Sequence, residues 1–243
     1  DKYELQLVND NCHSLGATYF HDKQYAVNYA DVVTQSFHPV KHITTGEGGA
    51  ILCNNDEIDR RTRLLRTHGT EQRRQVKQST IEEPWRYDMV DLGFNYRITD
   101  FQCALGLTQL RKLDWFLSER RRLASIYHEA LRDVEGITCP IEKASVKHAY
   151  HIFPIQADFE SLGISKGRLF SKFRELSINL QVHYVPIHLQ PYYQNRYGFR
   201  LGDFPNAEHY YSRTLTLPLY PGLKDEDVYR TCDILINASK NRP

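Results

Sequence analysis

The sequence predicts an α/β protein in which part of a mainly parallel-sheet domain, residues 1–125, is followed by a smaller α+β domain, residues 126–243. Three observations lead to this prediction. The first half holds short apolar runs that end in polar or glycine-rich turns, a long helical pattern follows from about residue 99, and shorter strands and helices alternate after Gly136. The domain boundary is therefore expected inside the long helix.

Three strands are expected in the first half. Residues 5–9 (LQLVN) end at Asp10 before the polar turn NCHSLGA, which is typical of a buried parallel strand with polar residues at its carboxyl end. Residues 32–37 (VVTQSF) are rich in β-branched side chains and stop before Pro39, which cannot donate to a ladder. Residues 48–54 (GGAILCN) form the third expected strand, which begins at two glycines and ends at Asn54, before Asn55 and Asp56.

The next stretch predicts two helices separated by a loop. Asp56 is expected to cap a helix over residues 57–66, whereas the polar residues 70–88 show no period, contain Pro84 and are expected to form a long loop. Thr99 or Asp100 is expected to cap an amphipathic helix that runs to about residue 134, with a kink around 114–118. Gly136 supplies its stop signal.

The second half predicts shorter elements. Helices are expected over residues 165–175 and 225–237, and apolar segments at 137–141, 148–156 and 178–187 suit short strands. The polar and aromatic stretch between 187 and 225 is expected to be a loop.

Composition narrows the classes of protein that fit. With 31 Lys+Arg against 30 Asp+Glu the formal charge is +1, so the basic excess of a nucleic-acid binder is missing. The longest apolar stretches are far shorter than a membrane span, and the first residues do not resemble a signal peptide. The five cysteines contain no CxxC pair, which favours a reducing cytoplasm over a disulfide framework. We expect a cytoplasmic protein that binds neither nucleic acid nor membrane.

The densest candidate site surrounds Lys41. This lysine lies on an expected turn between two strands, after Pro39 and before the glycine-rich sequence of residues 46–49. A poorly solvated amine in such a place suits Schiff-base chemistry, although a solvated surface charge is the common role of a lysine. The glycines do not form a dinucleotide motif, because Ile51 stands where the third glycine would be. The histidine pairs 38/42 and 148/151 lack a third ligand, so no metal site is expected.

Four motifs occur in one order along the chain: Asp10-x-x-His13, Ser36-x-x-x-x-Lys41, the GEGG of residues 46–49, and the Asn-Tyr-Arg of residues 95–97. This order resembles the pyridoxal-phosphate-dependent sugar aminotransferases of the DegT/DnrJ/EryC/StrS family. The resemblance implies fold-type I of the pyridoxal-phosphate enzymes. It further implies that residues 1–125 are the C-terminal portion of the large cofactor-binding domain, with the N-terminal part of the family fold not included before Asp1.

The resemblance assigns two catalytic residues. Lys41 matches the lysine that forms the Schiff base with pyridoxal 5'-phosphate and moves the proton during transamination. Asp10 matches the carboxylate that keeps the pyridine nitrogen of the cofactor protonated. A turn-forming role at the end of a strand is the alternative for Asp10.

The resemblance also assigns cofactor contacts. His13 stands where the family has a residue beside the cofactor ring, and Ser36 matches a hydroxyl that bonds the cofactor phosphate. Asn95 resembles the residue that reaches the phosphate in the neighbouring subunit, which implies a homodimer with a shared active site. Without the resemblance, a packed histidine, an ordinary strand serine and a helix N-terminal turn would each account for these residues.

Substrate contacts are implied for Arg97 and for His183 and Tyr184, the last two in the VHYVPI sequence of the second domain. The SFHxxK and VHYxPI patterns are closest to a branch of the family that acts in pseudaminic acid biosynthesis. The implied reaction moves an amino group from glutamate to C4 of a UDP-linked 4-keto-6-deoxy sugar, a nucleotide-sugar substrate for cell-surface polysaccharide. The alternative is a non-catalytic or truncated member that serves as a dimerising or sugar-nucleotide-binding module.

Overall fold

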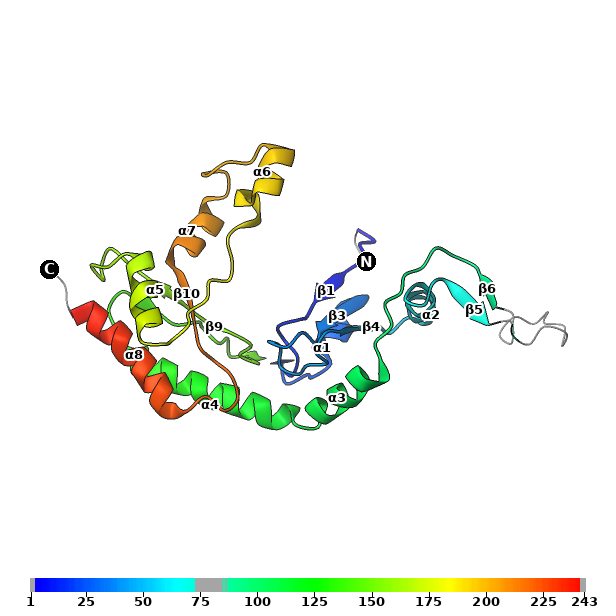
Figure 1. Ribbon diagram of the computed structural model, residues 1–243, viewed down its shortest axis with the longest axis horizontal. Helices are drawn as coiled ribbons and strands as arrows, with labels where there is room; N and C mark the ends of the chain where they lie inside the picture. Colours follow the sequence, from blue (N-terminus) through cyan, green and yellow to red (C-terminus); the bar gives the residue numbers. More distant parts are fainter. Residues whose placement is uncertain (1–2, 73–84, 86, 241–243) are drawn as a thin grey trace. The chain divides into compact units, whose positions relative to one another are not determined.

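The computed structural model describes residues 3–72, 85 and 87–240, and divides the chain into two compact units, Asp1–Leu113 and Asp114–Pro243 (Figure 1). The predicted family domains, residues 1–125 and 126–243, have a different boundary from these units, and their assignment stays a prediction. In the described part, no helix is both long and apolar enough to cross a bilayer.

The first unit is built on a three-stranded sheet with the order β1-β3-β4. Its strands are β1 (Val8–Asp10), β3 (Val32–Ser36) and β4 (Gly49–Leu52). β1 runs parallel to β3, and β4 runs antiparallel to β3. β2 (Thr18–Tyr19) and the short helix α1 (Tyr25–Tyr29) connect β1 to β3. The strands predicted at 32–37 and 48–54 are therefore confirmed.

The prediction of a buried strand at residues 5–9 is wrong in two respects. The strand begins only at Val8, and Leu5, Leu7 and Val8 are all exposed, Val8 at 69%. The reason is that β1 is an edge strand, bonded to β3 alone within its sheet, so its apolar side chains have little to pack against. The polar turn after Asp10 does follow the strand as expected.

Helix α2 (Asp56–Leu65) forms where a helix was predicted, but its cap is Asn55 and not Asp56. The Asn55 side chain accepts bonds from the backbone N–H groups of Glu57 and Ile58, which satisfies two otherwise unpaired donors. Beyond it, the expected loop over 70–88 is bordered by two short antiparallel strands, β5 (Thr70–Gln72) and β6 (Tyr87–Met89). Pro84 lies outside the described residues. Strands of three residues are too short to leave an apolar period in the sequence, which is why the pattern did not predict them.

The long helical pattern is divided into α3 (Asp100–Leu110) and α4 (Leu113–Leu131). Thr99 caps α3 as predicted, and Gln102 completes a capping box with it. The break lies at Arg111 and Lys112, a few residues before the predicted kink at 114–118.

The second unit holds a three-stranded antiparallel sheet with the order β10-β9-β7. Its strands are β7 (Ile137–Thr138), β9 (Phe153–Ala157) and β10 (Thr214–Leu217). The other elements are β8 (Val146–Lys147), α5 (Lys166–Glu175), the 3-10 turn η2 (Ile187–Leu189), α6 (Pro191–Tyr197), α7 (Pro205–Arg213) and α8 (Asp225–Lys240). The helices expected at 165–175 and 225–237 are confirmed.

The expected loop between 187 and 225 is wrong, because α6, α7 and β10 lie within it. Both helices begin with a proline at the first position, and α6 ends at Gly198 in the left-handed conformation. Proline at a helix start and glycine at its end are recognised boundary signals. Those signals could have predicted α6 and α7.

A single apolar core fills the second unit. Its fully buried side chains come from α4, the sheet, α5 and α8, and include Leu123, Tyr127, Phe153, Phe173 and Leu235. The buried guanidinium of Arg120 donates to the carbonyl oxygens of Tyr150, His151 and Leu219 at 3.2, 3.0 and 2.9 Å. Burial lowers the pKa of Arg120 to about 10. Arg120 therefore ties helix α4 to two loops of its own unit.

Gly49 allows β3 and β4 to approach closely beside Ser36. A Cβ at Gly49 would lie 2.5 Å from the backbone oxygen of Gln35, so any side chain must push the two strands apart. We expect Gly49→Ala to lower the free energy of unfolding by about 1–3 kcal/mol in a urea titration. Gly167→Ala is the matched control, because a Cβ there, in α5, meets nothing within 4 Å and should stabilise the helix by about 0.5–1 kcal/mol. Equal stability of Gly49→Ala and the unchanged chain would contradict the close approach.

Candidate active site

Asp10 occupies the last position of β1, where the chain leaves the sheet. Its Cα pairs in register with Thr34 of the central strand, so the two side chains are neighbours on one face. The carboxylate oxygen Oδ1 accepts the backbone N–H of Cys12 at 3.1 Å, and the N–H of Asn11 donates to the Thr34 oxygen at 3.0 Å. These bonds fix the turn that carries Asp10, Cys12 and His13.

The surroundings of Asp10 favour its ionised form. Hydrogen bonds from the Cys12 side chain and backbone are the largest causes that lower the pKa of Asp10, followed by the charges of His13 and Lys41. Desolvation acts in the opposite direction and is smaller than the bonds from Cys12. Three of the residues predicted from sequence, Asp10, His13 and Lys41, thus lie within electrostatic reach of one another.

Lys41 stands on the connection between β3 and β4. This connection is folded by bonds to the backbone oxygen of Phe37 from the Thr45 N–H at 3.0 Å and from the Thr44 hydroxyl at 3.0 Å. The backbone N–H of Lys41 donates to the backbone oxygen of His38 at 2.9 Å, and Lys41 is half-buried. In the described part of the chain, its ammonium group makes no hydrogen bond or ion pair, so the amine is available to a ligand.

Ser36 ends β3 opposite Gly49. Its hydroxyl oxygen accepts the backbone N–H of His38 at 3.3 Å, which leaves the hydroxyl proton free to donate. The sequence brings Ser36 and Lys41 to the same strand-loop junction, as the spacing predicted.

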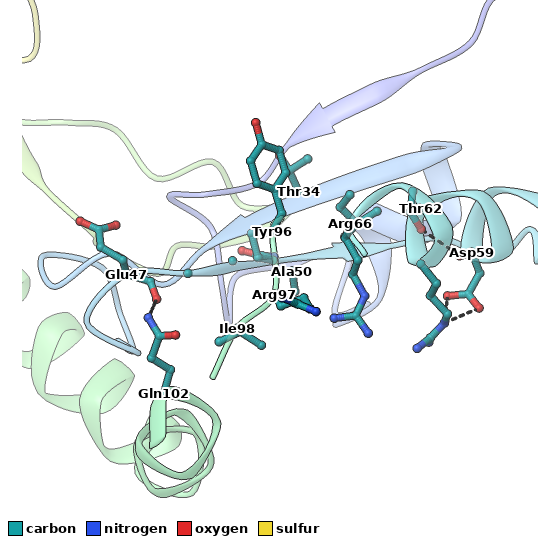
Figure 2. Close-up of a pocket in the computed structure, with 15 residues that line it drawn as sticks. Thr34, Glu47, Ala50, Asp59, Thr62, Arg66, Tyr96, Arg97, Ile98 and Gln102 are labelled. Atoms are coloured by element: carbon teal, nitrogen blue, oxygen red, sulfur yellow. Dashed lines mark hydrogen bonds and ion pairs between the residues drawn. The ribbon is translucent and has the colours of Figure 1, made fainter. Parts of the chain in front are cut away.

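A cavity of about 680 Å³ lies along β4 and α2 and receives Arg97, one of the predicted substrate contacts (Figure 2). The Arg97 Nε donates to the Asn95 side chain at 3.1 Å, and neither residue is hydrogen-bonded to Asp10 or Lys41 within the described residues. Tyr96, which lies between them in sequence, stacks on Phe94 with ring centroids 4.9 Å apart.

Arg66 lines the same cavity and was not singled out from the sequence. The other arginines of α2 have carboxylate partners: Arg60 binds Glu57 and Glu71, Arg61 binds Asp91, and Arg63 binds Asp59. Arg66 has no such partner among the described residues. A positive charge at the C-terminal end of a helix is an ordinary feature of sequences, so no sequence signal distinguishes it.

His183 and Tyr184 belong to the second unit. The Nδ1 of His183 lies 2.8 Å from the hydroxyl of Thr216 on β10, whereas Tyr184 is 63% exposed. The peptide bond between them is cis. One side chain is thus anchored and the other projects into solvent, and their predicted contact with substrate stays a prediction.

The histidines considered as metal ligands have other surroundings. The Nε2 atom of His38 lies 3.9 Å from Oε1 of Glu47, and the side chains of His42 and His151 are buried. Among the residues that the structure describes, no group of three or more His, Cys, Asp or Glu side chains is placed to hold a metal ion.

Comparison with known proteins decides the family. Residues 1–236 match the DegT/DnrJ/EryC1/StrS aminotransferase family. The chain belongs to this family. The family predicted from the order of the motifs is therefore confirmed.

Similar proteins include sugar aminotransferases. The chain is 35% identical over 236 residues to the UDP-4-amino-4,6-dideoxy-N-acetyl-β-L-altrosamine transaminase of Campylobacter jejuni, covering 97% of this chain and 59% of that protein. It superposes on Helicobacter pylori PseC, an aminotransferase of pseudaminic acid biosynthesis, with a TM-score of 0.85 and 27% identity over 98% of this chain and 61% of that one. It also superposes on the pyridoxal-phosphate form of the putative sugar aminotransferase Spr1654 from Streptococcus pneumoniae. The TM-score is 0.83 and the sequence identity 26%, over 96% of this chain and 57% of that one.

The chain spans 57–59% of the length of the curated relatives that it matches. Within that span, the predicted α/β class and fold-type I are confirmed by the structures that it superposes on.

Proposed function

We propose that this chain carries the cofactor-binding centre of a pyridoxal-phosphate-dependent sugar aminotransferase. One observation carries the proposal: in a member of this aminotransferase family, the half-buried amine of Lys41 is free of hydrogen bonds in the described part and lies within electrostatic reach of an ionised Asp10. An amine suits the aldehyde of pyridoxal phosphate, and a carboxylate suits its ring nitrogen.

The cofactor, when bound, supplies an electron sink for the carbon that carries the amino group. The protein's own residues then have distinct tasks. Asp10 would hold a proton on the ring nitrogen, because the bonds from Cys12 and the charges of His13 and Lys41 lower its pKa and keep it ionised. Lys41 would hold the cofactor through its aldehyde and would serve as the base that moves a proton on the amino donor.

Ser36 and His13 complete this centre. The hydroxyl proton of Ser36 would donate to the cofactor phosphate, and His13 would contact the cofactor ring. Asn95, together with Arg97, serves the equivalent centre of a second copy, so the working enzyme is a homodimer. The support for the dimer is the family to which the chain belongs, together with the resemblance of Asn95 to the family residue that reaches the neighbouring subunit.

For the substrate we propose a UDP-linked 4-keto-6-deoxy sugar that receives the amino group of glutamate at C4, as in pseudaminic acid biosynthesis. The support comes from the C. jejuni transaminase and from PseC. Arg97, His183 and Tyr184 are proposed to contact this substrate, with Arg66 as a further cation beside Arg97. A cytoplasmic location fits the five cysteines, which are all free thiols.

Covalent trapping tests the cofactor centre directly. Pyridoxal phosphate is added to the protein, the mixture is reduced with borohydride, and peptides are analysed by mass spectrometry. We expect the cofactor on the peptide that contains Lys41, and none there after Lys41→Ala. Lys23→Ala is the control, because Lys23 is an exposed lysine of the same unit. A label on other lysines, or none on Lys41, would contradict the proposal.

A further inference from the structure

The connection between β3 and β4, which carries Lys41, is closed by hydrogen bonds at its base. The Phe37 N–H donates to the Gly48 oxygen at 2.9 Å. On the returning side of the connection Thr45 is buried, and its hydroxyl donates to the backbone oxygen of Glu47 at 2.8 Å. These bonds set the path of the chain on both sides of Lys41.

Gln102 of α3 binds the same Glu47 oxygen from outside the connection. Its Nε2 donates to that oxygen at 2.8 Å, although the two residues lie 55 positions apart in the sequence (Figure 2). A carbonyl oxygen has two lone pairs, so the Thr45 hydroxyl and the Gln102 amide can bind it together. The bond from Gln102 thus attaches the returning side of the connection to a helix.

The first turn of α3 fixes which way the Gln102 amide points. Its Oε1 accepts the backbone N–H of Thr99 at 2.9 Å and the Thr99 hydroxyl at 3.0 Å. Because the amide oxygen faces these two donors, the amide nitrogen faces Glu47. Glutamate at this position would keep the acceptor for Thr99 but would lose the donor to Glu47.

Helix α3 also approaches the connection closely at a second point. A Cβ at Gly106 would lie 2.8 Å from Cγ2 of Thr45, so a residue without a side chain lets the helix come this near. The returning side of the connection is therefore both packed against α3 and hydrogen-bonded to it.

We propose that Gln102 is a positioning residue for Lys41, whose amide holds the connection in the path that presents the lysine amine to the cofactor. This inference rests on the proposed function for the role of Lys41. Gln102 itself takes no part in the covalent chemistry. Because Asn95 and Arg97 closely precede Thr99, the same amide also links their segment to the Lys41 connection.

Two substitutions separate this role from the stability of α3. Gln102→Glu keeps the acceptor that caps the helix, since glutamate is common at this position of a capping box, but it loses the donor to Glu47. Thr99→Ala does the reverse, because it removes the capping hydroxyl and leaves Nε2 of Gln102 bonded to Glu47. Gln109→Glu is the control for the added charge: it lies on the same helix, and its side chain makes no bond to the connection among the described residues.

The first experiment needs no cofactor. Hydrogen exchange is measured by NMR for the backbone N–H of Thr45, which is bonded to the Phe37 oxygen at 3.0 Å. We expect about tenfold faster exchange in Gln102→Glu, since losing a hydrogen bond makes local opening of the connection easier. The other two variants should exchange at the original rate. Unchanged exchange in Gln102→Glu overturns the proposal.

The second experiment measures the effect on Lys41 itself. Pyridoxal phosphate is added at a limiting concentration, samples are reduced with borohydride at intervals, and the label on the Lys41 peptide is followed by mass spectrometry. We expect labelling about three- to tenfold slower in Gln102→Glu, because the amine is less often in its productive position. Thr99→Ala should lower the midpoint of a urea titration and yet label at the original rate. Labelling of Gln102→Glu at the original rate overturns the proposal, even if the connection opens more often.

Thr45→Val provides an independent variant. It removes the other hydrogen bond to the Glu47 oxygen with little change in shape. If that oxygen fixes the connection, Thr45→Val should also label Lys41 more slowly. Labelling at the original rate in this variant would count against the Glu47 oxygen as the anchor and would overturn the proposal.

Turnover and labelling together separate this inference from the proposed function. With cofactor bound, Gln102→Glu should lower kcat about tenfold and leave KM for the sugar within about twofold, because the residue acts through Lys41. If the unchanged chain is never labelled at Lys41, the proposed function fails, and the inference that rests on it fails too. If Lys41 is labelled and Gln102→Glu matches the unchanged chain in exchange, labelling and kcat, the positioning role fails alone.

Discussion

Lys41→Ala should lower transamination by at least about 10³-fold, the largest loss expected of any single change in the chain. The variant loses both the covalent attachment of the cofactor and the base that moves the proton. The half-buried Lys41 side chain has no hydrogen-bond partner to leave behind among the described residues, so the fold should survive the change. Binding of pyridoxal phosphate should persist in part, through Ser36, Asp10 and His13.

Two measurements check this expectation. Turnover is followed with a nucleotide-linked keto sugar and glutamate, and cofactor binding is followed separately by fluorescence quenching. Small added amines should restore a fraction of the turnover in Lys41→Ala by standing in for the missing base. Lys23→Ala should behave as the unchanged protein. A Lys41→Ala enzyme that keeps more than a tenth of its turnover would show that a different group carries the chemistry.

The sequence predicted those parts of the site that depend on local order along the chain. Asp10 and His13 lie on one turn, and Ser36 and Lys41 lie at one strand-loop junction, so a fixed spacing was enough to place each pair. That the two pairs come together follows from the parallel register of β1 and β3, which the structure supplies and the strand pattern did not.

The features that the sequence did not predict depend on contacts across the fold. The pairing of Thr34 with Asp10 requires the register between β1 and β3. That Arg66 has no carboxylate partner among the described residues requires knowledge of which carboxylates the neighbouring arginines bind. The exposure of Val8 reflects an edge position rather than its apolar side chain. By contrast, the helices at Pro191 and Pro205 carried local signals and could have been predicted.

Asp10→Asn should fail in a different way from Lys41→Ala, because it leaves the covalent chemistry intact. The asparagine side chain keeps the shape and can still accept the Cys12 N–H at Oδ1. It carries no negative charge, so it cannot hold a proton on the ring nitrogen of the cofactor. Borohydride trapping on Lys41 should therefore persist, while turnover should fall by about 10²–10⁴-fold.

Asp22→Asn provides the matched control for this change. Asp22 lies in the same unit, and its Oδ1 accepts the backbone N–H of the residue two positions further along, Gln24, at 2.7 Å, as Asp10 does with Cys12. Asparagine keeps an oxygen acceptor for this turn bond and removes only the charge, so Asp22→Asn should retain its turnover. Near-normal turnover in Asp10→Asn would mean that another carboxylate faces the ring nitrogen. The assignment of β1 to the cofactor centre would then be wrong.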